Sequence, residues 1–261
     1  MRSTVLAAAV TAAAITSTIA SPTTGQVVAD GPALQANLQT TVTSRYLRRG
    51  RDLSAGALSM HVDAQVAWRD GIAFKAFARE GISSDTRTLD ELHLGVWYNH
   101  GIVPGWQLNA GHIAFLTFMP FAPLTNNAAH VKVSGALYFG IVRSLQPLSL
   151  SASYMRKYGP GAADVVSLRV KSSVGFLAGV VASPFIQADY EAPSGVTGTF
   201  EDRMASVEAA IPLRRAVGPF AVTASCHLTW IPSAFVQSLN EAAGLGTDGV
   251  LPWVSLSIGV R

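Results

Sequence analysis

Charged and histidine side chains recur at alternate positions in several short segments of this chain. His61 and Asp63 are two residues apart, as are Glu91 and His93. Because successive side chains of a β-strand point to opposite faces, this spacing places each pair on one face of a strand. The same reasoning selects a larger set of polar-face residues: Arg45, His61, Asp63, Arg69, Lys75, Arg79, Glu91, His93, Lys132, Arg169, Lys171, Asp189, Glu191, Glu208 and His227.

In a closed sheet these side chains would line an interior, where the sign of the charge determines which ions pass. Leaving the histidines aside, seven of them are basic and five are acidic. This excess favours a weak preference for anions. The alternative is that they only solvate the interior or pair across it, because barrels of moderate size are often filled.

Catalytic and metal-binding patterns are absent from the sequence. None of the recognised local signatures of serine hydrolases surrounds any of the six histidines. His61, His93 and His227 could converge inside a barrel and bind a metal together with Asp63, but no pair has the close spacing of common zinc motifs. We therefore expect no catalytic residues, no metal and no cofactor. An outer-membrane lipid hydrolase or deacylase is the enzymatic alternative.

Twelve segments of alternating apolar and polar residues would hold these side chains. The predicted strands are 36–47, 57–69, 72–80, 90–99, 106–118, 130–143, 147–157, 164–172, 176–191, 202–213, 219–231 and 250–261. The connections between them alternate between long and short, and Asp70-Gly71 is a dipeptide typical of a two-residue hairpin. Long connections at one end and tight turns at the other are typical of an outer-membrane barrel with both chain ends on the periplasmic side.

Composition also favours a membrane protein without helical spans. Apolar residues make up 49% of the chain and charged residues only 13%, about half the usual share of a soluble domain. No stretch after the N-terminal region reaches the roughly 18 consecutive apolar residues of a membrane-spanning helix. The predicted fold class is therefore all-β, a closed antiparallel transmembrane barrel. A soluble β-sandwich, with its apolar face inward, is the alternative.

Residues 1–20 have the composition of a secretory signal peptide, and cleavage after residue 29 fits nearly as well. Residues 21–35 would form an N-terminal periplasmic segment and 36–261 the barrel. We expect the bacterial outer membrane as the location, with its lipids, the barrel-assembly machinery and small solutes or ions as partners, and a homo-oligomer as an open option. Cys226 is the only cysteine, and the chain has no basic run typical of nucleic-acid binding.

Aromatic residues near the predicted strand ends would form the interfacial girdle of a barrel. They are Tyr46, Trp68, Tyr98, Trp106, Phe118, Tyr154, Tyr190, Phe220 and Trp230. Two segments depart from simple alternation. Residues 112–119 predict a β-bulge, and Pro184 removes a donor from the strand that it interrupts.

Residues 43–54, which run Thr-Ser-Arg-Tyr-Leu-Arg-Arg-Gly-Arg-Asp-Leu-Ser, resemble the first hairpin of the TorF-like porins of bacterial outer membranes. In that family a strand ending in an aromatic residue runs into an Arg-Gly turn and a Ser-containing loop, before an alternating strand like 58–68. The resemblance implies an outer-membrane barrel that acts as a porin. The last segment departs from the usual pattern, because it ends in Ile-Gly-Val-Arg rather than in an aromatic residue.

These observations together predict a porin or channel for the passive passage of small solutes or ions. Two alternatives remain open at this point. One is a non-conducting barrel that has a structural or surface-binding role, with the long connection 232–249 as its contact. The other is the lipid hydrolase or deacylase named above.

Overall fold

The computed structural model describes residues 34–48, 51–52, 58–68, 71–81, 90–119, 130–159, 162–176, 179–193, 204–232, 236–237, 241 and 249–260. The predicted signal peptide lies outside the described residues. None of the helical residues in the described part belongs to a helix long and apolar enough to span a membrane.

Antiparallel strands follow one another along the described chain. They are β1 (Leu34–Thr43), β2 (Leu47–Arg48), β3 (Arg51–Asp52), β4 (Ser59–Trp68), β5 (Ile72–Gly81), β6 (Asp90–Val103), β7 (Trp106–Met119), β8 (His130–Leu145), β9 (Leu148–Tyr158), β10 (Ala163–Ser172), β11 (Val174–Gly175), β12 (Val180–Ala182), β13 (Phe185–Pro193), β14 (Met204–Val217), β15 (Phe220–Trp230) and β16 (Val250–Val260). Strands β2 and β3 form a separate two-stranded sheet, and all the others belong to one large sheet.

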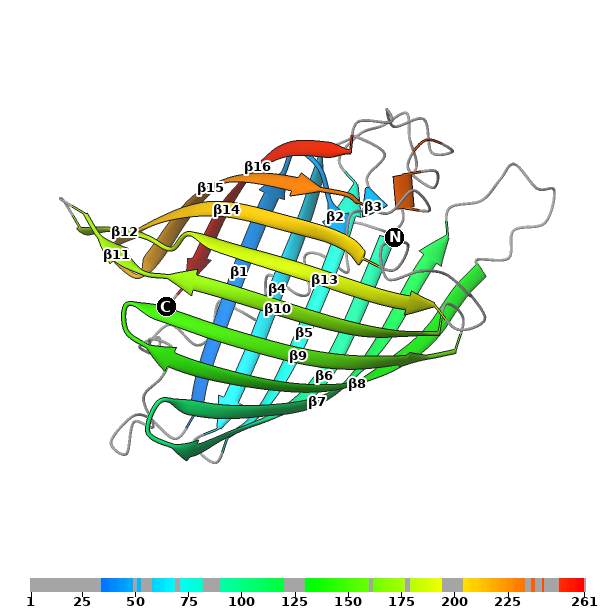
Figure 1. The fold of residues 1–261 in the computed structure, drawn as a ribbon, viewed down its shortest axis with the longest axis horizontal. Coiled ribbons are helices and arrows are strands. Elements are labelled where there is room, and N and C mark those ends of the chain that lie inside the picture. Colours follow the sequence, from blue (N-terminus) through cyan, green and yellow to red (C-terminus); the bar gives the residue numbers. More distant parts are fainter. Residues whose placement is uncertain are drawn as a thin grey trace.

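The large sheet closes on itself. Strand β1 pairs with both β4 and β16, while β15 pairs with both β14 and β16, so the first and last strands are neighbours. Twelve of the strands form the resulting ring, and Figure 1 shows them running obliquely around the barrel. Closure removes the unpaired edges that a membrane-spanning sheet cannot leave in lipid. The prediction of a closed, twelve-stranded antiparallel barrel is confirmed.

The outward face of the barrel is apolar. Phe74, Leu94, Phe139, Leu168 and Leu256 are between 48% and 56% exposed, although they lie in the interior of regular strands. In a soluble β-sandwich such residues would be buried between two sheets. Exposed large apolar side chains on strand after strand are instead the surface that acyl chains require, so the sandwich alternative is wrong.

Most of the predicted girdle aromatics also face outward. Trp68, Tyr98, Tyr154, Phe220 and Trp230 are between 38% and 50% exposed. The guanidinium of Arg143 lies 4.9 Å from the centre of the outward-facing Trp106 ring, a cation–π contact suited to a membrane interface. The side chain of Phe118 lies outside the described residues.

Tyr46 is an exception, because its side chain turns into the barrel interior, where it contacts His61 and Phe77. The predicted first strand ends four residues too late. Strand β1 stops at Thr43, and Ser44 takes over the pairing with Val254: its backbone N–H donates to the Val254 carbonyl, and its hydroxyl accepts the Val254 N–H, both at 3.0 Å. Beyond this point the alternation of β1 no longer determines side-chain direction.

The predicted bulge in 112–119 is also wrong. The pairing of β7 with β8 is continuous from Trp106 to Met119, and the shift in the β6–β7 register lies at the other end, next to Gly101. Residues 112–119 lack alternation for a different reason: Ile113 and Phe115 are apolar residues that face inward.

The predicted short turn at 173–175 is wrong in position. The hairpin continues through β11 and β12, and the chain reverses near Gly179, whose φ of 71° suits a turn. Pro184 does interrupt the strand as expected, separating β12 from β13, and its carbonyl accepts the N–H of Ser172 at 2.9 Å. In Figure 1 this small hairpin projects beyond one end of the barrel.

The apolar outward face predicts that a charged substitution there costs folding free energy, by an amount that depends on its depth in the membrane. Leu94 is an outward-facing residue of β6 with 48% of its surface exposed, and we expect Leu94→Arg to cost about 2–4 kcal/mol of folding free energy in lipid vesicles. Asn37→Arg is the control, because Asn37 is an exposed residue on the inward face of β1 and is expected to cost less than about 0.5 kcal/mol. Urea titrations followed by tryptophan fluorescence measure both; equal penalties would contradict a lipid-facing Leu94.

Candidate functional site in the barrel interior

The register of the strands determines which side chains share the inner face. Directly opposed residues of neighbouring strands point to the same face, so the ladder can be followed around the barrel. The inner face carries these predicted site residues: His61, Asp63, Lys75, Arg79, Glu91, His93, Arg169, Lys171, Asp189, Glu191, Glu208 and His227. Arg79, Glu91, Asp189 and Glu191 are each less than a tenth exposed.

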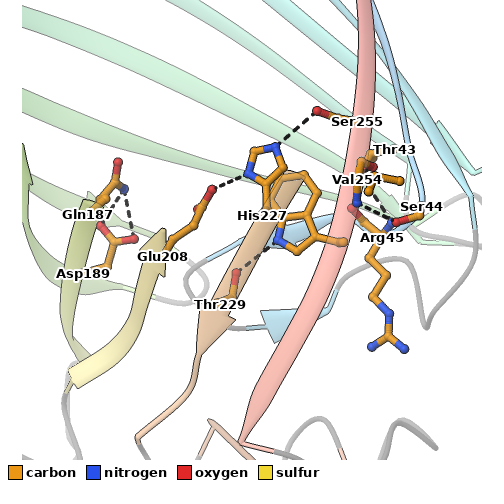
Figure 2. Close-up of polar contacts among 11 residues, drawn as sticks. Thr43, Ser44, Arg45, Gln187, Asp189, Glu208, His227, Thr229, Val254 and Ser255 are labelled. Atoms are coloured by element: carbon orange, nitrogen blue, oxygen red, sulfur yellow. Dashed lines mark hydrogen bonds and ion pairs between the residues drawn. The ribbon is translucent and has the colours of Figure 1, made fainter. Parts of the chain in front are cut away.

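Three predicted residues are not in this group. Arg45 follows the end of β1, where its carbonyl accepts a hydrogen bond from the hydroxyl of Thr43. In Figure 2 its side chain extends away from the group around His227. Arg69 lies outside the described residues. Lys132 pairs through its backbone with Thr117, and its side chain lies outside the described part.

A row of rings crosses one part of the inner wall. Tyr46, His61, Phe77, His93 and Phe115 have successive ring centroids 6.0, 5.3, 4.8 and 4.7 Å apart. Four of them come from the neighbouring strands β4, β5, β6 and β7. We call this group the aromatic row. Sequence alternation placed the two histidines on the polar face but could not show that phenylalanines and a tyrosine would separate them.

A cavity of about 530 Å³ lies inside the barrel against the aromatic row. Its lining also includes Asp63, Lys75, Trp97, Tyr138 and Met155. This volume lies within the range of small-molecule sites, which are usually mostly apolar with a few polar groups. The lining has that mixed character.

Two glycines allow Trp97 to lie close to the inner wall. A Cβ on Gly111 would lie 2.7 Å from the six-membered ring of Trp97, and a Cβ on Gly95 would lie 2.8 Å from its Nε1 atom. The free face of the ring meets Lys75, whose Nζ is 4.5 Å from the ring centre, and Tyr138 approaches edge-on at 4.6 Å. Trp97 therefore forms part of the cavity wall because these two side chains are missing.

Part of the interior is apolar rather than wet. Phe115, Ala136, Met155 and Val165 form a buried cluster, each less than a tenth exposed. They come from four consecutive strands of the ring, β7 to β10. The inner face is therefore not polar throughout on this side of the barrel.

The acidic residues of β13 are held by neighbours on the wall. Lys157 Nζ lies 2.6 Å from Glu191 Oε1. The hydroxyl of Ser167 donates to Asp189 Oδ1 at 2.5 Å, and the amide nitrogen of Gln187 lies 3.0 and 3.1 Å from the two Asp189 oxygens. The Lys157 ammonium therefore offsets the charge of Glu191, whereas the neutral donors Ser167 and Gln187 fix the position of Asp189.

Basic residues gather nearer the end of β10. Arg169 lies over the ring of Phe185, with its guanidinium carbon 3.7 Å from the ring centre, and it is attracted by Glu208 and Asp189. Lys171 is one step further along the inner face. The main charges acting on Lys171 are those of Arg169 and Arg214, and both repel it. This group of Arg169, Lys171 and Arg214 is called the basic patch.

A hydrogen-bonded line of three side chains crosses β14, β15 and β16. His227 Nδ1 lies 2.8 Å from Glu208 Oε1, and His227 Nε2 lies 3.3 Å from the hydroxyl oxygen of Ser255 (Figure 2). The indole of Trp253 stacks on the imidazole with ring centroids 3.5 Å apart, and its N–H donates to Thr229. The sequence indicated Glu208 and His227 as inner-face residues but not Ser255 as their partner.

The three histidines considered as metal ligands do not converge. His61 and His93 belong to the aromatic row, whereas His227 contacts Glu208, Ser255 and Trp253. Within the described part of the chain, no group of three histidine, cysteine or acidic side chains is arranged to hold a metal ion.

Comparisons with known proteins support the architecture. No family model and no curated protein matches the sequence. Among solved structures, the KdgM porin superposes with a TM-score of 0.55 at 6% identity, covering 86% of this chain and 98% of its own. The NanC porin superposes with a TM-score of 0.53 at 10% identity, covering 86% of this chain and 98% of its own. The chain thus shares the fold of these outer-membrane barrels.

The contact between Trp97 and Gly111 yields a stability prediction. Gly111→Ala should destabilise the barrel by about 1–3 kcal/mol, because the new methyl group overlaps the indole. In a Trp97→Ala background the same substitution should cost much less. Gly175→Ala is the matched control, since a Cβ there meets no atom within 4 Å. Urea unfolding in vesicles measures the unmodified protein, the two single variants, the double variant and the control; additive costs of the two substitutions would contradict the contact.

Proposed function

We propose that this protein is an outer-membrane channel for the passive passage of small solutes or ions, with a weak preference for anions. The observation that carries the proposal is the contrast between the two faces of one closed sheet. Large apolar side chains cover the outside, while charged residues and a cavity of about 530 Å³ occupy the inside. The two similar barrels are described as porins, which supports the same role here. The TorF-like resemblance points in the same direction and remains a prediction.

The distribution of charge supports the anion preference. Each of the acidic residues here lies near a cation: Lys157 contacts Glu191, and Arg169 is attracted by Glu208 and Asp189. Lys171, in contrast, experiences the repulsion of two further cations. A mobile anion near the basic patch would relieve that repulsion, whereas a mobile cation would add to it.

A non-conducting barrel is the second candidate, and the apolar cluster of Phe115, Ala136, Met155 and Val165 favours it. Interiors of small barrels are often filled by side chains. The two candidates differ in a single measurable property, which is the passage of ions through the folded protein.

Purified protein reconstituted in planar bilayers should produce discrete single-channel steps. Liposome swelling with solutes of graded size should then show a size cutoff, because the passage is bounded by a fixed wall of side chains. Heat-unfolded protein is the control in both assays. If folded protein gives neither steps nor swelling, the channel proposal fails and the non-conducting candidate is supported.

Reversal of one lumenal charge should change ion selectivity. In a salt gradient, the reversal potential of the unmodified protein should have the sign of a mild anion preference, and Lys171→Glu should move it toward cations. Arg215→Glu is the control: it makes the same charge change on the opposite, outward face of β14 and should leave the potential almost unchanged. Clear cation selectivity of the unmodified protein would overturn the anion preference.

A further inference from the structure

We infer that Ser255 is a base-activated nucleophile that cleaves carboxylic esters of small, water-soluble solutes inside the barrel. This activity goes beyond passive passage. It rests on the hydrogen-bonded line of Glu208, His227 and Ser255, in which a hydroxyl, an imidazole and a carboxylate are connected in the order that nucleophilic catalysis requires (Figure 2).

The register explains how three strands bring these groups together. His227 lies opposite Ala210 on β14 and opposite Trp253 on β16. Glu208 is the inward-facing residue of β14 that precedes Ala210. Ser255 is the next inward-facing residue of β16 after Trp253, displaced along the barrel wall in the opposite direction, and it lies opposite Ser225. The line therefore runs diagonally across the ladder, a separation that side chains of this length can span.

The hydrogen-bond roles follow from the carboxylate. An ionised carboxylate can only accept hydrogen bonds, so the Nδ1–H of His227 donates to Glu208. In the neutral imidazole this leaves the lone pair on Nε2, which lies 3.3 Å from the Ser255 oxygen and can accept its proton. Distances slightly beyond the ideal are usual for such pairs in the absence of substrate.

The imidazole is also held in place. Trp253 stacks against it at 3.5 Å between ring centroids, and the hydrogen bond from Trp253 Nε1 to Thr229, 3.1 Å long, fixes the indole. The side chain of His227 is only 9% exposed. Glu208 is a positioning residue in this arrangement, whereas Ser255 and His227 are the groups that would touch the substrate.

The ester and water are the only reactants that this hydrolysis needs. Ser255 Oγ attacks the ester carbonyl carbon while its proton passes to His227 Nε2. The bond from that carbon to the alkoxy oxygen breaks, and the alcohol leaves with the proton from His227. Water, deprotonated by His227, then hydrolyses the acyl-serine, which releases a carboxylic acid and restores the serine hydroxyl.

The position of the line selects the substrate class. All three side chains belong to the inner face, and Ser255 is partly exposed there, so its hydroxyl faces the barrel interior and not an acyl chain of the surrounding bilayer. Backbone N–H groups of β15 and β16 are engaged in a continuous ladder, which leaves few donors for a developing oxyanion. Esters, which are easier to cleave than amides, fit such a site.

Labelling of the full-length folded protein tests the nucleophile without any substitution. A fluorophosphonate probe at pH 8 should modify Ser255, and peptide mass spectrometry identifies the modified residue. Heat-unfolded protein should not react. Absence of label on Ser255 in protein that retains its folded mobility on an unheated gel would overturn the inference.

Activity measurements on single variants distinguish the roles of Ser255, His227 and Glu208. Hydrolysis of p-nitrophenyl acetate should vanish in Ser255→Ala and fall about 10²–10⁴-fold in His227→Gln. Glu208→Gln should lower kcat with KM almost unchanged, which a general loss of structure would not do. Ser225→Ala, the matched control on the neighbouring strand, should retain full activity.

Two outcomes distinguish this inference from the channel proposal. The Ser255→Ala variant should still conduct ions, because the substitution leaves the barrel intact. If the unmodified protein conducts but hydrolyses no ester, the esterase inference is overturned and the channel proposal stands. Cleavage of bilayer phospholipid in preference to the soluble ester would overturn the assigned substrate class.

Discussion

Closure of the sheet is the constraint on which the rest of the structure depends. In a hydrocarbon layer every backbone donor and acceptor of the wall must be paired within the protein, and the ladder between β1 and β16, from Leu38–Val260 to Thr43–Ser255, completes the ring. A buried hydrogen bond of 2.8 Å between the hydroxyls of Thr41 and Ser257 crosses this seam on the inner face. A slip of one residue here would turn that pair toward lipid and bring apolar side chains inside.

Strand alternation made most of the fold predictable, because apolar and polar residues alternate with a period of two in a strand whose two faces meet different environments. The final strand shows this well: Val254, Leu256 and Ile258 face outward, and Ser255 and Ser257 face inward. The rule fails where the chain leaves a strand or where both faces are apolar. Tyr46 lies three residues beyond the end of β1, so tertiary packing decides its direction. Phe115 belongs to an apolar cluster inside the barrel. Both faces of that segment are therefore apolar, so its sequence shows no alternation and was interpreted as a bulge.

The candidate sites were less accessible to sequence reasoning, because they depend on register between strands. Alternation could assign Glu208 and His227 to the inner face, but their alignment with Ser255 depends on the pairing of β15 with β16, which a connection of 19 residues separates. The interior consequently has two different sides. Rings and apolar groups from β4 to β10 surround the cavity, while β13 to β16 carry hydrogen-bonded carboxylates, His227 and Ser255.

The glycines behind Trp97 have an evolutionary consequence. The indole approaches the wall only because two side-chain carbons are missing, at Gly95 and Gly111. A codon for glycine becomes one for alanine through a single base change, so one mutation can displace the indole and reshape the interior beside it, at the cost in stability that the overlap brings, while the strand pairing and the lipid contacts stay the same. Related proteins can therefore differ in the shape of this interior at these two positions, without rebuilding the barrel.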